Sequence, residues 1–306
     1  MQLPPSVRRA IEERADDVGF PAVKRAATAL SEAYREGRTA RLASDEAIAA
    51  YLVTRMPATY AAARAVLGEL RGMEIASMLD IGAGTGAAAL AARELFPGAS
   101  QITLIERDPS LAETALLFLP GAAAIHADLS RMTEFPPHDL VVAAWSLGEL
   151  SGNIAARLWD AARVALVVIE PGTPRGAALI RSVREELLAA GAHMIAPCPA
   201  AMPCPLAEPD WCHFAERVER SSLHRRVKDG ALGYEDEKYS YVALARNQAP
   251  PGWARVLRRP RHHPGLIELE LCTPHGVEAK RIARRDRPAF RAARKAEWGG
   301  RYCAGA

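Results

Sequence analysis

The stretch Met78-Leu-Asp-Ile-Gly82-Ala-Gly84-Thr-Gly86 decides the fold of this chain. Its apolar start predicts a short buried strand, and its glycines allow a sharp turn into the helix expected over residues 86–98. Glycines in such a turn also let the backbone pass close to a bound ligand. The stretch therefore predicts a cofactor loop between a strand and a helix, with the acid Asp80 just before the turn.

Apolar strands alternate with helices downstream of this loop. Four more strands are expected at residues 101–108, 122–129, 138–147 and 165–172. Such alternation is typical of a parallel sheet, so we predict a doubly wound, Rossmann-like α/β fold.

The rest of the chain divides into regions of different character. Residues 1–72 carry apolar residues at helical spacing, residues 73–194 form the sheet core, and residues 171–194 are expected to end it as a helix. Residues 195–245 hold a Cys-rich segment and a sixth strand, and residues 246–306 read as basic antiparallel strands with a final helix. Five prolines within residues 195–213 exclude regular structure there.

Two further acids fit the glycine loop. Glu106 ends the second strand, where a carboxylate can bind both ribose hydroxyls, and Asp128 ends the third, where an acid can accept from an adenine amino group. Together with Asp80 and the glycines, they resemble class I methyltransferases that use S-adenosyl-L-methionine (SAM). NAD is the alternative cofactor, because residue 87 is Ala, which the NAD pattern tolerates. A glycine turn that binds nothing is the third interpretation. The predicted cofactor-binding residues are Asp80, Gly82, Gly84, Gly86, Glu106 and Asp128.

No catalytic residue can be assigned. Amino-group methyltransferases carry an Asn/Asp-Pro-Pro-aromatic motif after the fourth strand, whereas this chain has Ala144-Trp-Ser-Leu-Gly-Glu149-Leu150. Glu149 is a candidate base, although an acid there is also typical of a helix start. A cysteine nucleophile at Pro197-Cys198 or Pro203-Cys204 is disfavoured, because both lie after the fifth strand.

The five cysteines all lie in the last 109 residues, and three of them lie within 15 residues. An odd, clustered set does not suggest a disulfide framework; in a reducing compartment it favours a metal site. Cys198, Cys204, Cys212 and Cys272 supply four thiolates for a 4Fe–4S cluster or, alternatively, Zn²⁺. The wide spacings favour the larger cluster. His213 and His275 are alternative ligands, and Cys303 is expected to be unliganded.

The basic charge is concentrated near the C-terminal end. Residues 213–301 hold 20 Lys and Arg against 11 Asp and Glu, within a chain of net charge +3. Arginines with interleaved aromatics favour a nucleic-acid partner over a merely solvated surface. On a helix, residues 217, 220 and 224 would share one face. The predicted RNA-binding residues are Arg217, Arg220, Arg258, Arg259 and Arg261.

Several runs together resemble the methyltransferase-like family of the small ribosomal subunit, the Rsm-twenty-two type. They are Cys198-Pro through Met202-Pro-Cys204-Pro-Leu206, Asp210-Trp-Cys-His-Phe214, Arg217-Val-Glu-Arg220, Tyr234-Glu-Asp-Glu-Lys-Tyr-Ser-Tyr241, Ala58-Thr-Tyr60, Gly148-Glu-Leu150, Glu170-Pro-Gly-Thr-Pro174 and Arg259-Pro-Arg261. The resemblance implies a SAM-type fold, small-subunit rRNA as partner and an iron–sulfur cluster on the four cysteines. It implies either an rRNA methyltransferase or, alternatively, a non-catalytic assembly factor.

Composition narrows the class of protein. Hydrophobic residues make up 49% and charged residues 25%, which is typical of a globular chain. No apolar run is long enough to span a bilayer, and the first residues lack the apolar stretch of a secretory signal. We therefore expect a cytoplasmic monomer without a membrane partner.

Overall fold

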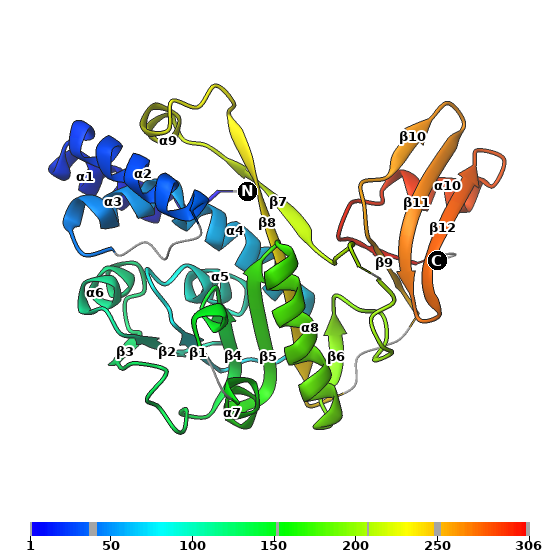
Figure 1. Cartoon of the computed structure of the whole chain (residues 1–306), viewed down its shortest axis with the longest axis horizontal. Helices are drawn as coiled ribbons and strands as arrows, with labels where there is room; N and C mark the ends of the chain where they lie inside the picture. The colour runs from blue at the N-terminus through cyan, green and yellow to red at the C-terminus, as the bar shows by residue number, and fades with distance from the viewer. Residues whose placement is uncertain (1, 37–41, 151–152, 207, 248–251, 304–306) are drawn as a thin grey trace. The chain divides into compact units, whose positions relative to one another are not determined.

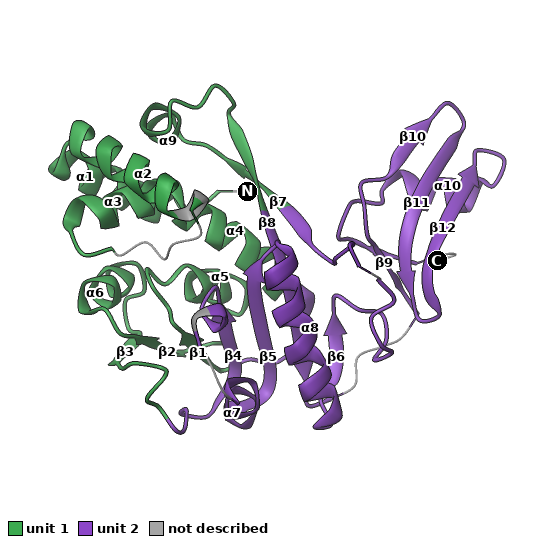
Figure 2. Cartoon of the chain, in the orientation of Figure 1, with its two compact units in different colours: residues 1–68, 76–132, 216–237 green, residues 69–75, 133–215, 238–306 purple. Residues whose placement is uncertain are grey.

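A computed structural model describes residues 2–36, 42–150, 153–206, 208–247 and 252–303 (Figure 1). The chain forms two compact units, each built from separate stretches of sequence (Figure 2). Unit 1 comprises residues 1–68, 76–132 and 216–237, and unit 2 comprises residues 69–75, 133–215 and 238–306. The domain boundaries given above follow the chain without interruption and stay a prediction.

Unit 1 begins with the predicted helical region. Its helices are α1 (Pro5–Val18), α2 (Phe20–Arg35), α3 (Asp45–Thr54) and α4 (Met56–Leu67). The Ser44 hydroxyl accepts from the Ala47 N–H and caps α3, whose first turn carries Asp45 and Glu46. This combination satisfies an open backbone donor and complements the helix dipole, so α3 begins where the sequence indicates.

The sheet of unit 1 is parallel. Strand β1 (Ser77–Ile81) pairs with β2 (Gln101–Glu106), and β2 pairs with β3 (Ala123–His126). Helices α5 (Ala87–Leu95) and α6 (Pro109–Phe118) connect them, as predicted. All five residues of β1 are buried, which explains its continuous apolar pattern.

Unit 2 carries a mixed sheet in the order β4-β5-β8-β6. Strands β4 (His138–Ala144) and β5 (Ala162–Pro171) are parallel, whereas β8 (Tyr234–Ala245) runs antiparallel to both β5 and β6 (His193–Ala196). Helices α7 (Ile154–Ala161) and α8 (Pro174–Ala189) belong to this unit, with the short 3-10 turn η2 (Leu147–Glu149). The 3-10 turn η1 (Gly68–Leu70) begins at the last residue of a unit 1 segment.

The helix expected over residues 171–194 is too long. Gly191 has a φ of +87°, a conformation that ends a helix, and residues 193–196 then form β6. The expected helical face at residues 217, 220 and 224 is also wrong. Residues 214–219 form strand β7 (Phe214–Glu219), and the Ser221 hydroxyl then caps α9 (Ser222–Val227).

A second, antiparallel sheet completes unit 2. Strand β11 pairs with β10, β12 and β9, and β9 pairs with β13. The elements are β9 (Ala254–Val256), β10 (Arg261–His263), β11 (Leu266–Thr273), β12 (Gly276–Ala283), α10 (Arg287–Arg294) and β13 (Arg301–Tyr302). Its core contains Val256, Leu269, Leu271, Ile282 and Tyr302.

The predicted doubly wound α/β class is thus confirmed, together with its N-terminal helices and antiparallel C-terminal strands. In the described part of the chain, no helix is both long and apolar enough to cross a membrane.

Candidate functional site

The glycine loop follows β1 in unit 1 and depends on left-handed backbone. Gly82, Gly84 and Gly86 have φ angles of +68°, +53° and +77°, which side chains disfavour. The N–H groups of Gly82 and Ala83 donate to the Ile105 carbonyl of β2 at 2.9 and 3.0 Å. A Cβ atom on Gly84 would meet no atom within 4 Å, so this backbone borders open space.

Glu106 holds the loop from the end of β2. Its Oε2 accepts from the Gly84 N–H, and its Oε1 accepts from the Asp108 N–H, both at 2.9 Å. A carboxylate offers about four lone pairs, so each oxygen can accept a further hydroxyl donor. The acid predicted to bind ribose therefore lies beside the open backbone of Gly84.

Asp80 lies beneath the loop rather than beside the open space. Its side chain is 1% exposed, and its Oδ2 accepts from the Ala89 N–H in α5 at 3.0 Å. Burial raises the pKa of Asp80 to about 7, although the Ala89 hydrogen bond opposes that shift. The carboxyl group therefore ties β1 to the first turn of α5.

Asp128, the third predicted acid, follows β3. Its Oδ1 accepts from the Ser130 hydroxyl at 2.7 Å and the Ser130 N–H at 3.0 Å. These hydrogen bonds lower the pKa of Asp128, so its carboxylate is charged at neutral pH. The predicted cofactor residues thus all lie within unit 1.

The segment after β4, in unit 2, is held by Glu170. The Oε1 atom of this 4% exposed residue accepts from the N–H groups of Leu147 and Gly148 at 3.0 and 3.3 Å. Trp145 adopts a φ of +56°, a strained conformation for an aromatic residue. The side chain of Glu149, the candidate base, lies outside the described part of the structure.

The four predicted cysteine ligands surround one cavity in unit 2. Cys198, Cys204 and Cys212 come from the proline-rich segment, and Cys272 comes from β11. The Ser240 hydroxyl donates to the Cys212 carbonyl at 2.8 Å and thereby fixes this end of the segment on β8. Leu206 and Leu257 pack with Cys272 and enclose the thiols. No carboxylate or imidazole lines the cavity among the described residues, and the Tyr241 hydroxyl, which also lines it, donates to Glu69 at 3.3 Å. The candidate metal ligands of the cavity are therefore its thiols.

The thiols interact electrostatically. Burial, together with the charges of Cys198 and Cys204, raises the pKa of Cys272 to about 12. For Cys212, burial and the other three thiolates raise the pKa well above its ordinary value. All four cysteines line the same cavity. However, no three His, Cys, Asp or Glu side chains in the described residues are placed to hold a single metal ion. The cysteines surround a cavity rather than a point, and both the iron–sulfur cluster and the zinc alternative stay predictions.

The other candidate ligands lie elsewhere. His213 stacks on Trp211, with ring centroids 5.1 Å apart, and the His275 N–H donates to Thr273. Neither residue lines the four-cysteine cavity, and Cys303 is exposed.

The predicted RNA-binding arginines of unit 1 are engaged in ion pairs. Arg217 forms two hydrogen bonds with Asp236, at 2.8 and 3.1 Å, and lies 3.9 Å from the Tyr234 ring centre. Arg220 pairs with Glu235 at 2.9 Å, and its side chain is only 17% exposed. Arg217 remains half-exposed, whereas Arg220 is largely inaccessible to a phosphate.

In unit 2, the predicted arginines precede and begin β10. Arg258 pairs with Asp210, Arg259 lies over the Trp298 ring at 5.9 Å, and Arg261 is exposed. Their neighbours on β12 and α10 include Arg281 and Arg291, which are also exposed. Tyr239 and Tyr241 in β8 are instead buried against Phe214, so they cannot stack on a base.

Sequence reasoning missed two buried cations, Arg184 and Arg255, which line the four-cysteine cavity. A signal for Arg184 existed, because it lies among Ile180, Val183 and Leu187 on the buried side of α8. A lone cation in an apolar stripe indicates a specific partner.

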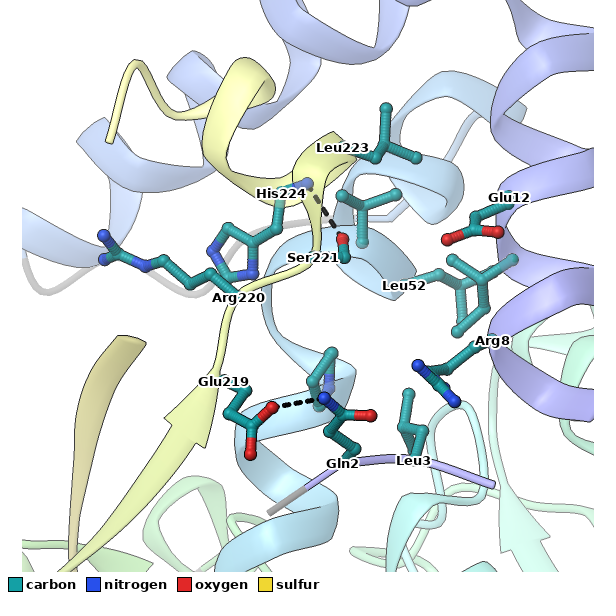
Figure 3. A pocket seen from close by; sticks show the side chains of 13 residues that line it. Gln2, Leu3, Arg8, Glu12, Leu52, Glu219, Arg220, Ser221, Leu223 and His224 are labelled. Carbon is teal, nitrogen blue, oxygen red and sulfur yellow. Dashed lines mark hydrogen bonds between the residues drawn. The ribbon is translucent and has the colours of Figure 1, made fainter. Parts of the chain in front are cut away.

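A different cavity lies wholly in unit 1 (Figure 3). Its polar lining residues include Gln2, which donates to Glu219, and Ser221, whose hydroxyl accepts from the His224 N–H. Its apolar lining residues include Leu3 and Leu52. Its volume of about 80 Å³ is far below the roughly 300–1,000 Å³ of small-molecule sites. We interpret it as a packing gap among α1, α3 and residues 219–224.

The family "Mitochondrial small ribosomal subunit Rsm22" matches residues 45–303. The human "Ribosome assembly protein METTL17, mitochondrial" is 27% identical over 81% of this chain and 61% of its own length. The Schizosaccharomyces pombe "Rsm22-cox11 tandem protein 2, mitochondrial" is 24% identical over 88% of this chain and 45% of its own length. A Geobacter metallireducens precorrin-6y C5,15-methyltransferase structure is 18% identical, with a TM-score of 0.41 over 60% of this chain and 86% of its own.

The chain thus spans about half to three fifths of the curated relatives it matches. These relatives and the family are described as mitochondrial, which contradicts the cytoplasmic location expected from the sequence. The expectation failed because an apolar stretch marks only secretion or membrane insertion and does not distinguish compartments inside a cell.

Proposed function

Because the chain belongs to the mitochondrial small ribosomal subunit Rsm22 family, we propose that it acts in small-subunit assembly by binding SAM and small-subunit rRNA. One observation carries the SAM part of this proposal. The Gly84 backbone borders open space and is held there by Glu106, whose carboxylate can also accept ribose hydroxyls. A phosphate-binding role is supported by the exposed Arg261 and by its exposed neighbours Arg281 on β12 and Arg291 on α10.

A second candidate function is methyl transfer to rRNA. The intact glycine loop favours it, and so does the strained Trp145 at the end of β4, because ligands bind at the carboxyl ends of parallel strands. Against it, Glu170 already accepts from the Leu147 and Gly148 amides, and it offers no base to a substrate there. We therefore place assembly first and transfer second.

Cys198, Cys204, Cys212 and Cys272 would hold a 4Fe–4S cluster in this proposal. The donor set supports it, because four thiols from two distant segments enclose one cavity. A bound cluster would join the proline-rich segment to β11, and so fix the basic β10–β12 strands on the rest of unit 2. Its role here is structural, since four protein ligands leave no open coordination position.

The test combines binding and transfer. Calorimetry should detect SAM binding to the wild-type protein and none to Gly84→Arg, whose side chain would fill the open space. Tritium transfer from labelled SAM to immature small subunits then separates the two functions. Binding without transfer supports the assembly role, transfer supports the enzyme, and no binding by iron-loaded wild-type protein contradicts the SAM proposal.

The cluster is tested separately by metal analysis of anaerobically purified protein. Iron and sulfide in equal amounts support it, whereas one zinc without iron contradicts it. Changing any of the four cysteines to Ser should remove the iron, and the exposed Cys303→Ser should retain it.

A further inference from the structure

Two buried guanidinium groups adjoin the four-cysteine cavity. Arg184, on α8, is 4% exposed, and Arg255, on β9, is 1% exposed; both line the cavity. An isolated buried charge costs several kcal/mol, as a general rule, unless it is paired and hydrogen-bonded. Both side chains therefore require hydrogen-bond partners inside the protein.

Arg255 has every nitrogen but one engaged. Its Nε donates to the Pro197 carbonyl at 2.9 Å, and its Nη1 donates to Glu69 and to the Gly299 carbonyl, both at 2.6 Å. Its Nη2 is buried without a hydrogen-bond partner in the described residues. Arg255 and Cys272 are paired residues of the neighbouring strands β9 and β11. Because the other nitrogens point to their carbonyl and carboxylate partners, Nη2 is the donor left for the cavity.

Arg184, on α8, likewise has one buried nitrogen without a hydrogen-bond partner in the described residues. Its Nη2 donates to the carbonyls of Ala200 and Met202 and so holds the proline-rich segment between two of the cysteines. Its Nε is buried and has no partner within the described residues. The guanidinium also lies beside Cys198, where its charge and hydrogen bonding oppose the burial that raises the pKa of this thiol.

We propose that Arg184 and Arg255 are the charge-balancing hydrogen-bond donors to the sulfur atoms of an anionic iron–sulfur group in this cavity. The inference rests on the four-cysteine cluster proposed above. Four thiolates around an iron–sulfur core carry net negative charge, and their sulfurs accept N–H donors. The cluster would thereby satisfy Arg255 Nη2 and Arg184 Nε, and the two cations would offset its buried charge. They are positioning residues, since neither is an iron ligand.

This arrangement has a measurable consequence. Hydrogen bonds to cluster sulfurs and nearby positive charge stabilise the more negative, reduced form, which raises the reduction potential. Removing either donor should shift the midpoint potential to more negative values. A residue that only holds the loop would change iron retention and stability without shifting the potential of the cluster that remains.

The experiment uses the full chain, purified anaerobically, with Arg184→Lys, Arg255→Lys and Arg184→Gln. Lysine keeps the positive charge but lacks the planar set of guanidinium N–H donors, and glutamine lacks both the charge and this set of donors. The matched control is Arg175→Gln, an exposed position on the same helix. Iron and sulfide are quantified first, and the midpoint potential is measured by dye-mediated titration of the visible absorption. Loss of iron to a chelator gives a second readout.

The expected result is a negative potential shift in both lysine variants and a larger one in Arg184→Gln, with faster iron loss and an unchanged control. Wild-type protein without iron and sulfide would overturn the cluster itself. Iron-loaded variants whose potentials equal that of Arg175→Gln would overturn the role of the arginines while leaving the cluster intact. If Arg255→Lys fails to fold, the two Arg184 variants alone decide.

Discussion

The Glu106 Oε2 atom lies 2.9 Å from the backbone nitrogen of Gly84, which donates a hydrogen bond to it. The acid that ends the second strand thus holds the loop that follows the first strand, across 22 residues of sequence. Glu106 has two tasks in the proposed SAM site, because the same carboxylate shapes the loop and offers acceptors to a ligand.

Glu106→Ala should therefore weaken SAM binding more than Glu106→Gln. Alanine removes the acceptors for Gly84, for Asp108 and for the ligand, at a cost of about 1–3 kcal/mol, whereas glutamine keeps one acceptor oxygen. Calorimetric titration with SAM measures both variants. Glu134→Gln changes an exposed acid elsewhere and should bind like the wild type. Equal affinities for the Ala variant and the wild type would contradict this role.

Gly84→Ala and Gly86→Ala should differ in stability. Both place a side chain at positive φ, which costs roughly 1–2 kcal/mol. At Gly86 the new Cβ would also lie 2.8 Å from Leu119 Cδ1 and 3.0 Å from Ala115 Cβ, so overpacking adds about 1–3 kcal/mol. Urea unfolding should show the larger loss for Gly86→Ala. Equal losses for the two variants would contradict the overpacking at Gly86 and would show that α6 can shift away from the loop.

Asp80 should make the free energy of unfolding fall as pH rises. Burial raises its pKa to about 7, so the folded protein retains a proton that the unfolded chain releases above about pH 4. The contribution of Asp80 to the free energy of unfolding is therefore fully present below about pH 4 and is lost by about pH 7. This contribution is at most about 4 kcal/mol.

Asp80→Asn cannot ionise and should flatten this dependence between pH 5 and pH 8. Melting temperatures at the two pH values give the measurement, and the exposed Asp160→Asn serves as control. A variant that loses as much stability as the wild type between these pH values would show that Asp80 is charged throughout.

Arg261 and Arg220 should have opposite effects on RNA binding and stability. The exposed Arg261, changed to Glu, should weaken binding to small-subunit rRNA and lower the slope of log affinity against log salt by about 1. Arg220→Gln instead breaks the half-buried pair with Glu235 and should cost roughly 1–3 kcal/mol of stability. Its affinity for RNA, measured on folded protein, should not change. An RNA affinity independent of salt would refute the basic surface altogether.

Local patterns sufficed for the order of the elements and for the kinds of residue in each site. The glycine loop, the acids at strand ends and the alternation of strands and helices depend on neighbours a few residues apart, so they are visible in the chain itself. The failed predictions come from contacts between segments that are far apart in the sequence. Residues 214–219 extend as β7 because they pair with β8, a distant strand, and no helical spacing in the sequence records that partner.

The sequence by itself determined the α/β fold, the glycine loop with Glu106 and the set of four cysteines. Only the tertiary structure decided that Cys272 shares a cavity with Cys198, Cys204 and Cys212, and that Arg255 stands opposite Cys272 on β9. It also decided that Arg220 forms an ion pair with Glu235, whereas Arg261 is exposed. The reason is physical: burial, ion pairing and strand pairing depend on which segments meet in space, whereas the glycine turn and the spacing of apolar residues depend mostly on adjacent residues.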